Sequence, residues 1–193
     1  MRTDYLNPEL YNRLYTIMTY PNVLALRICL ETGLRIDDAL SLKPEQLRGR
    51  TLRGIAEKTG KPYKKTISCD LSKRLIQYMG KNFIFPHRLD EKRHRTRQAV
   101  WSNMKTAAQA LGVELNAAPH STRKTYAVER LHDVGLEQTR KDLQHDRIST
   151  TMIYAFSNML SASSVTNATD DNKLEYLAEL IACKVVEKLK KEP

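Results

Sequence analysis

The sequence lacks long apolar runs, clustered cysteines and glycine-rich loops. No apolar run approaches the roughly 20 residues that span a bilayer, and residues 1–5 lack the apolar core of a signal peptide. Cys29, Cys69 and Cys183 are isolated and odd in number, which favours reduced thiols in the cytoplasm over disulfides. No phosphate-binding loop and no metal-ligand spacing of His, Cys and carboxylate residues occur. These absences argue against a membrane partner, a metal site and a nucleotide cofactor.

Positive charge, by contrast, is abundant. The chain carries 32 Lys and Arg residues against 22 Asp and Glu residues, which gives a formal net charge of +10. Such a balance favours a polyanionic partner, usually nucleic acid, over an anionic membrane surface or a role in solubility alone. At 193 residues the chain can bury a substantial core. We therefore expect mainly one domain that binds nucleic acid.

Periodicity and capping signals predict a mainly α-helical α+β fold. Asn7-Pro8 and Asp70 are read as helix starts, and Gly33 as a helix stop. Alternation around a Lys-Thr-Gly-Lys-Pro turn predicts one antiparallel hairpin. The expected helices cover residues 8–18, 21–32, a short turn around Asp38, 71–79, 96–111, 119–133, 137–144 and a segment from about 150; the expected strands cover 51–57 and 63–68.

The C-terminal part has a different composition. Residues 158–172 are rich in Ser, Thr and Asn and are predicted to be a linker between a domain at 1–157 and a final amphipathic helix at 173–193. Leu174, Leu177, Ile181 and Val185 form an apolar stripe that must be covered. Docking on another copy of the chain and packing on its own domain are both open.

Five short pieces carry residues suited to phosphate chemistry. In order they are Arg35 with Asp38 three positions on, Lys58 in the hairpin turn, His120 with Arg123, His145, and Tyr154 nine positions later. His120 and Arg123 share a face at a helix N-terminus, where free N–H groups and the helix dipole favour an anion. Singly, each piece also has an ordinary explanation: a surface ion pair, a solvated turn lysine or a core tyrosine.

Taken together in this order, the pieces resemble the catalytic domain of the tyrosine recombinases, the phage integrase family. The resemblance covers roughly residues 6–157 and implies the recombinase fold, mainly helical with a small antiparallel β-sheet. It implies an active site of Arg35, Lys58, His120, Arg123, His145 and Tyr154, supported by Asp38. Lys61, Lys64 and Lys65 are alternatives to Lys58. The sequence departs from the family at Gln144, where relatives usually have Gly.

The resemblance implies a site-specific recombinase that cuts and rejoins DNA through a 3′-phosphotyrosyl intermediate, without a cofactor or metal. Two arginines would neutralise the phosphate, a lysine would protonate the leaving oxygen and the tyrosine would attack. The alternatives are a type IB-like topoisomerase and a non-catalytic DNA-binding regulator with the same fold. Arg35 lies so near the start that we expect either a fragment or a short form resembling the recombinases of fimbrial phase variation.

The implied partner is double-stranded DNA, with a homotetramer on DNA and a monomer or weak oligomer when free. Further DNA contacts are predicted at Arg95, Arg97, Lys105 and Lys124, of which Lys105 lies within the helix expected at 96–111. The predicted location is the cytoplasm.

Overall fold

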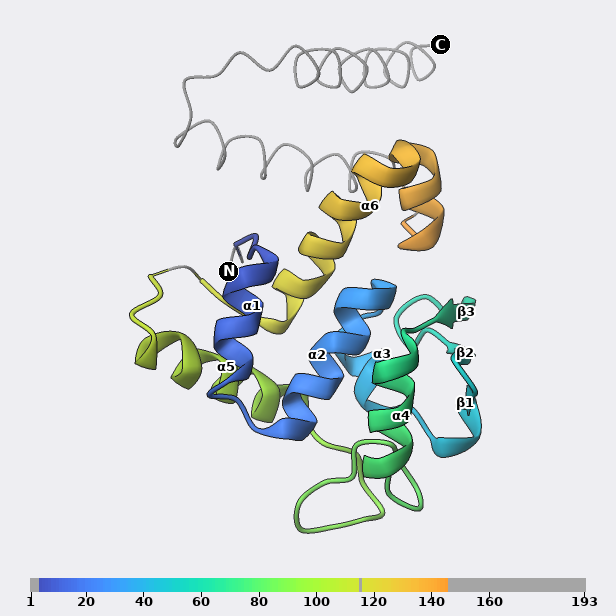
Figure 1. Cartoon of the computed structure of the whole chain (residues 1–193). Helices are drawn as coiled ribbons and strands as arrows, with labels where there is room; N and C mark the ends of the chain where they lie inside the picture. The colour runs from blue at the N-terminus through green and yellow to red at the C-terminus, as the bar shows by residue number, and fades with distance from the viewer. Residues whose placement is uncertain (1–3, 115, 146–193) are drawn as a thin grey trace, which may run out of the picture.

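The computed structural model describes residues 4–114 and 116–145. Within them the chain forms a body of helices with a small sheet at one side (Figure 1). In chain order the elements are α1 (Pro8–Tyr15), α2 (Tyr20–Thr32), α3 (Ile36–Leu40), η1 (Pro44–Gln46), β1 (Leu47–Arg48), β2 (Thr51–Ile55), β3 (Pro62–Thr66), α4 (Cys69–Tyr78), α5 (Arg97–Ala110) and α6 (Pro119–Asp142). The predicted α+β class, mainly helical with a small antiparallel sheet, is confirmed.

Helix α2 is the centre of the core. It packs against α3, α4, α6 and β3, and Figure 1 shows it between α1 and α5 on one side and α4 and the sheet on the other. Leu24, Leu26 and Ile28 are fully buried, as expected for a segment that is apolar nearly all round. Gly33 ends α2 with φ 70°, in the left-handed region that the predicted stop required. The chain therefore turns sharply just before Arg35.

The sheet has three antiparallel strands in the order β1-β2-β3. The predicted hairpin is present, with Arg53 opposite Lys64 and Gly54 opposite Tyr63. β1 was not predicted, because two residues carry no alternation and exist as a strand only by pairing with β2. Leu52 and Tyr63 are buried, whereas Arg53 and Lys64 are exposed. One face of the hairpin thus packs on the core and the other is basic.

Helix boundaries follow the predicted caps with two corrections. The Asn7 side chain accepts a hydrogen bond from the Leu10 amide at 2.8 Å, but α1 ends at Tyr15 and not at 18. Helix α4 is capped by Ser68, whose hydroxyl accepts from the Leu71 amide, and not by Asp70. Asp70 lies in the first turn and pairs with two arginines instead.

Helix α6 carries a break in the middle. Gly135 has φ 77° and ψ 178°, so the two predicted helices on either side of it form one kinked element. The expected helix bearing Tyr154, the linker at 158–172 and the helix at 173–193 lie outside the described residues. In the described part of the chain, no helix has the length and apolar character needed to cross a membrane.

Candidate active site

Residues from four separate parts of the chain line one open cavity of about 1100 Å³. Its cationic and imidazole side chains are Arg35, Lys58, Arg97, His94, His120 and Arg123. The acidic residues in its wall are Asp37, Asp38 and Glu57. Four of the six predicted catalytic residues therefore share one space, although up to 88 positions separate them in the sequence.

Arg35 enters the cavity from the start of α3. It is the residue before the helix, in extended backbone with φ −71° and ψ 151°, two positions after the turn at Gly33. The side chain is half-buried. Within the described residues its guanidinium makes no hydrogen bond or ion pair, so its donors are available to a ligand.

Arg123 is held far more tightly. It is only 4% exposed, and its two terminal nitrogens donate to the carbonyl oxygens of Gly33 and Leu143. The guanidinium thus joins the end of α2 to the residue that follows α6. Charge-assisted hydrogen bonds of this kind are stronger than neutral ones. Arg123 is therefore part of the fold as well as of the cavity wall.

His120 sits at the start of α6 beside these cations. His120 as a residue is exposed to solvent at the cavity. Protein atoms nevertheless surround much of its ring. Burial of the ring, followed by the charges of Arg123, Lys124, Arg35 and Lys58, lowers the pKa of His120 to about 4. The imidazole is consequently neutral at physiological pH and keeps one nitrogen able to accept a proton.

The hairpin contributes Lys58, which is exposed and lines the cavity. The predicted alternatives lie differently: Lys64 projects from the exposed face of β3, and Lys65 donates to the carbonyl of Asp142 at 2.6 Å. Burial lowers the pKa of Lys65, with the Asp142 carboxylate opposing that shift. The geometry therefore supports Lys58 over these two.

Asp38 contacts the hairpin that carries Lys58. One carboxylate oxygen accepts from the backbone amide of Glu57 at 2.8 Å, next to Lys58. Its other oxygen, Oδ2, is buried and has no hydrogen-bond partner among the described residues. This contact holds the start of the hairpin turn, and the supporting role of Asp38 in the active site stays a prediction.

His145 follows the end of α6 and is buried. It is 8% exposed and is separated from Leu143, whose carbonyl accepts from Arg123, by Gln144. Gln144 has φ 53° and is the only non-glycine with positive φ among the described residues. The backbone that glycine would favour is therefore adopted here by glutamine. His145 is not part of the described lining of the cavity, and Tyr154 lies outside the described residues.

A comparison with family models places this site in context. Residues 4–160 match the model of the phage integrase family. The chain belongs to that family. It is 29% identical over 136 residues to the tyrosine recombinase XerD of Lacticaseibacillus casei, and 28% identical over 154 residues to the integrase of Escherichia phage P2. These matches cover 64% and 79% of this chain, but 46% and 43% of the relatives. The chain thus spans about half the length of the curated relatives it matches.

Solved structures agree on the fold of this phage integrase family member. The catalytic domain of bacteriophage HP1 integrase aligns with a TM-score of 0.63 at 22% identity, covering 88% of this chain and 98% of that one. A lambda integrase in a dimer bound to a COC' core site aligns with a TM-score of 0.68 at 18% identity, covering 80% and 48%. At these identities the likeness concerns the fold alone.

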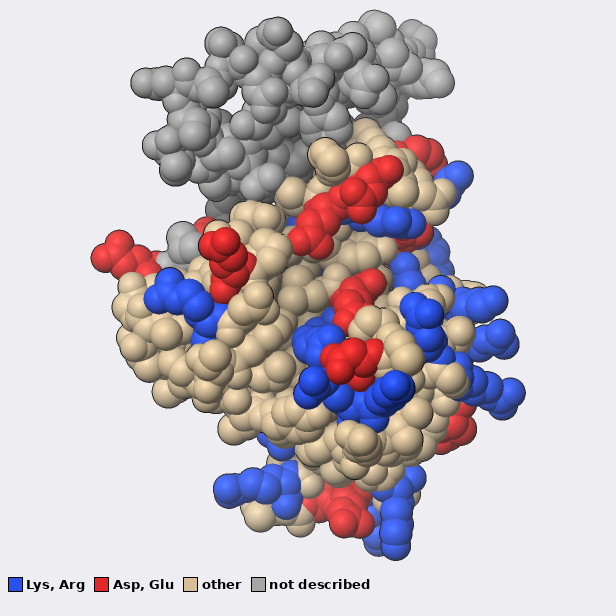
Figure 2. Space-filling model, in the orientation of Figure 1, with Lys and Arg blue, Asp and Glu red and all other residues tan. Residues whose placement is uncertain are grey.

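The residues predicted to contact DNA divide into two groups. Arg97 lines the cavity and stays 68% exposed while it pairs with Asp37 at 3.4 Å, and Arg95 is half-buried. The Lys105 amine donates to Asn116 Oδ1 at 2.9 Å, so its contact with DNA stays a prediction. Lys124 is only 8% exposed, and its contact with DNA likewise stays a prediction. Figure 2 shows further Lys and Arg side chains projecting where Figure 1 draws the sheet.

Among the cavity-lining residues that the sequence analysis did not predict are three large side chains near the start of α5. Gln98 and Trp101 lie three apart on the first turns of α5, and His94 precedes that helix. The available signal was the i, i+3 spacing of Gln98 and Trp101 just after the N-cap Thr96, because residues three apart lie on the same face of a helix. Among the described residues, no group of three or more His, Cys, Asp or Glu side chains could hold a metal ion.

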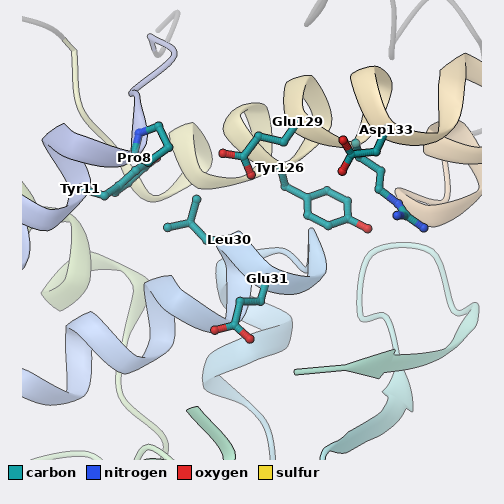
Figure 3. A pocket seen from close by; sticks show the side chains of 8 residues that line it. Pro8, Tyr11, Leu30, Glu31, Tyr126, Glu129 and Asp133 are labelled. Atoms are coloured by element: carbon teal, nitrogen blue, oxygen red, sulfur yellow. The ribbon is translucent and has the colours of Figure 1, made fainter. Parts of the chain in front are cut away.

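A second cavity, of about 380 Å³, has the opposite character (Figure 3). Glu31 from α2 and Glu129 and Asp133 from α6 line it together with Tyr126, and Arg130 is the one cationic residue in its wall. Burial, and next the Asp142 carboxylate, raises the pKa of Tyr126. The three carboxylates outnumber the single guanidinium of Arg130, which disfavours a phosphodiester beside Tyr126.

Proposed function

We propose that this chain is the catalytic part of a site-specific DNA recombinase, which cuts and rejoins double-stranded DNA through a 3′-phosphotyrosyl bond to Tyr154. The observation that carries the proposal is the shared cavity of Arg35, Lys58, His120 and Arg123. Family membership adds independent support. A relative that is a tyrosine recombinase and a structural neighbour that is a lambda integrase bound to a core site support the same proposal.

The reaction balances with these side chains alone. The hydroxyl oxygen of Tyr154 attacks the scissile phosphorus, and the bond from phosphorus to the 5′ oxygen breaks. The tyrosyl proton passes to the neutral ring of His120, while the Lys58 ammonium donates a proton to the leaving 5′ oxygen. In rejoining, the 5′ hydroxyl attacks and the tyrosine leaves, so the bond energy is conserved and no ATP is needed.

The two arginines supply the electrostatic part. Charge develops on the non-bridging oxygens of the pentacoordinate phosphorus, and preorganised guanidinium groups stabilise it without reorganisation. Arg123 is fixed by its two carbonyl contacts, whereas the donors of Arg35 are available. His145 would donate a further hydrogen bond to a non-bridging oxygen.

The partner and assembly follow from the same proposal. The bound DNA would lie over the cavity mouth, with Arg95 and Arg97 on its backbone, in a homotetramer that forms on DNA in the cytoplasm. Residues 1–157 would form the catalytic domain. The helix at 173–193, reached through the linker at 158–172, would dock on a neighbouring copy.

A nicked duplex that loses the short strand after cleavage tests the activity, because the covalent adduct then accumulates. We expect an adduct with the unchanged chain and none with Tyr154→Phe, which keeps the ring and removes only the nucleophile. Tyr126→Phe is the matched control and should still form the adduct.

Three other outcomes decide against the proposal. Binding without an adduct would indicate a regulator that has kept the fold. Relaxation of supercoiled DNA without joining of partner sites would indicate a topoisomerase. An adduct that survives in Tyr154→Phe would move the nucleophile to another residue.

A further inference from the structure

Gln144 occupies a backbone conformation that L-residues rarely adopt. Its φ is 53°, and every other positive φ in the described residues belongs to glycine. The left-handed region crowds Cβ against the backbone, so a glutamine persists there only where its surroundings hold it. The contacts of its side chain therefore need an explanation.

Both ends of the Gln144 amide reach the hairpin that carries Lys58. Its nitrogen Nε2 donates to the carbonyl of Pro62 at 2.9 Å, and its oxygen Oε1 accepts from the hydroxyl of Thr59 at 3.3 Å. Thr59 is the residue after Lys58, and Pro62 is the first residue of β3. One amide thus bridges the two ends of the turn.

The turn has other bonds, but these set its shape and not its position. Inside the turn itself, the Ala56 amide donates to the Lys61 carbonyl, and the Ala56 carbonyl accepts from the Gly60 amide. Two more contacts tie the hairpin to the body of the protein: Asp38 to the Glu57 amide, and Lys65 to the Asp142 carbonyl. Asp142 contacts Lys65 within β3, whereas Gln144 contacts Thr59, the residue next to Lys58.

We propose that Gln144 is a positioning residue for Lys58. It latches the hairpin turn to the segment that bears His145, and so holds the Lys58 ammonium where the leaving 5′ oxygen emerges. This inference rests on the proposed recombinase function. It adds a residue at the position where relatives usually carry glycine, which has no side chain to make such a contact.

Gln144→Gly isolates the latch, because glycine adopts φ 53° without strain and only the side chain is lost. The unfolding midpoint should change little, because the relieved backbone strain offsets the lost hydrogen bonds. Amide exchange at Thr59, Gly60 and Lys61 should accelerate, since the turn loses its two contacts to Gln144. Cleavage of ordinary DNA should slow about 10-fold, because a misplaced catalytic group costs rate even when its chemistry is intact.

The decisive readout is a substrate with sulfur in place of the leaving 5′ oxygen. A thiolate leaves without a proton, so the general acid becomes unnecessary. We expect Gln144→Gly to cleave this substrate at the rate of the unchanged chain. Lys58→Ala is the control, with a larger defect on ordinary DNA and the same recovery on the sulfur substrate.

The alternative results separate the two levels of the argument. If Lys58→Ala recovers on sulfur but Gln144→Gly cleaves ordinary DNA at full speed, or stays slow on both substrates, the positioning role is overturned. If Lys58→Ala stays slow on both, Lys58 is not the acid and the inference fails with that assignment. If the unchanged chain forms no adduct, the failure belongs to the proposed function.

Discussion

Arg35 and Arg123 are predicted to matter equally for cleavage and very differently for stability. Replacing either by alanine removes one preorganised positive charge, which usually costs on the order of 10²-fold in rate. Only Arg123 also holds the fold together, through the carbonyls of Gly33 and Leu143. The pair therefore provides its own control.

The size of the stability difference follows from the contacts. A hydrogen bond to a charged group contributes about 1.5–3 kcal/mol, so two of them sum to roughly 3–6 kcal/mol. Removing the buried guanidinium also removes its desolvation penalty. The expected loss in the free energy of unfolding for Arg123→Ala is therefore about 3 kcal/mol. Arg35 makes no hydrogen bond within the described residues, so Arg35→Ala should stay within about 0.5 kcal/mol.

Urea and thermal unfolding followed by circular dichroism measure this difference. At about 2–4 °C per kcal/mol for a chain of this size, Arg123→Ala should melt roughly 6–12 °C lower. Arg123→Lys should recover part of the stability, because one ammonium cannot reproduce the two divergent N–H groups. Adduct formation is then compared at a temperature where all variants are folded. An Arg123→Ala protein as stable as Arg35→Ala would refute the linking role of Arg123.

Three further predictions concern pH, salt and the C-terminal helix. Because the pKa of His120 is about 4 when folded, below its ordinary value of 6.5, the unfolded chain binds the proton more readily. The free energy of unfolding should thus fall as the pH is lowered from about 6.5 to 4. Urea titrations across this range should show a smaller fall for His120→Asn. DNA affinity should decline with a log–log salt slope of about −0.9 per phosphate contact, and a flat dependence would contradict the cationic interface. Truncation after Thr169 should leave a folded chain that binds one half-site without cooperative assembly, measured by gel shift; melting would favour packing in cis, and full recombination would make the helix dispensable.

Local signals predicted the helices well, because caps and stops depend on a few adjacent atoms. Asn7 caps the helix that it was expected to cap, the helix expected from residue 96 begins after its N-cap Thr96, and Gly33 takes the positive φ that ends α2. Where two capping residues stand close together, the sequence does not decide between them. Ser68 takes the cap of α4, since Asp70 is drawn to Arg27 and Arg74.

The candidate site could be predicted as a set of residues but not as a set of contacts. The order of the motifs identified Arg35, Lys58, His120 and Arg123, which the fold does bring to one cavity. Charge alone, however, does not distinguish an exposed lysine from a buried one such as Lys124. The bonds from Arg123 join residues 90 and 20 positions away, and no local pattern encodes such distances.

Gln144 shows how a departure from a family pattern becomes interpretable once contacts are known. The left-handed backbone costs a non-glycine residue about 1–2 kcal/mol. Its two side-chain hydrogen bonds to Thr59 and Pro62 return about 0.5–1.5 kcal/mol each, so the strain is offset within the same residue. Glycine would keep the path of the chain but leave the turn beside Lys58 without this contact. The substitution therefore changes how firmly the hairpin is held, while the route of the backbone into His145 stays the same.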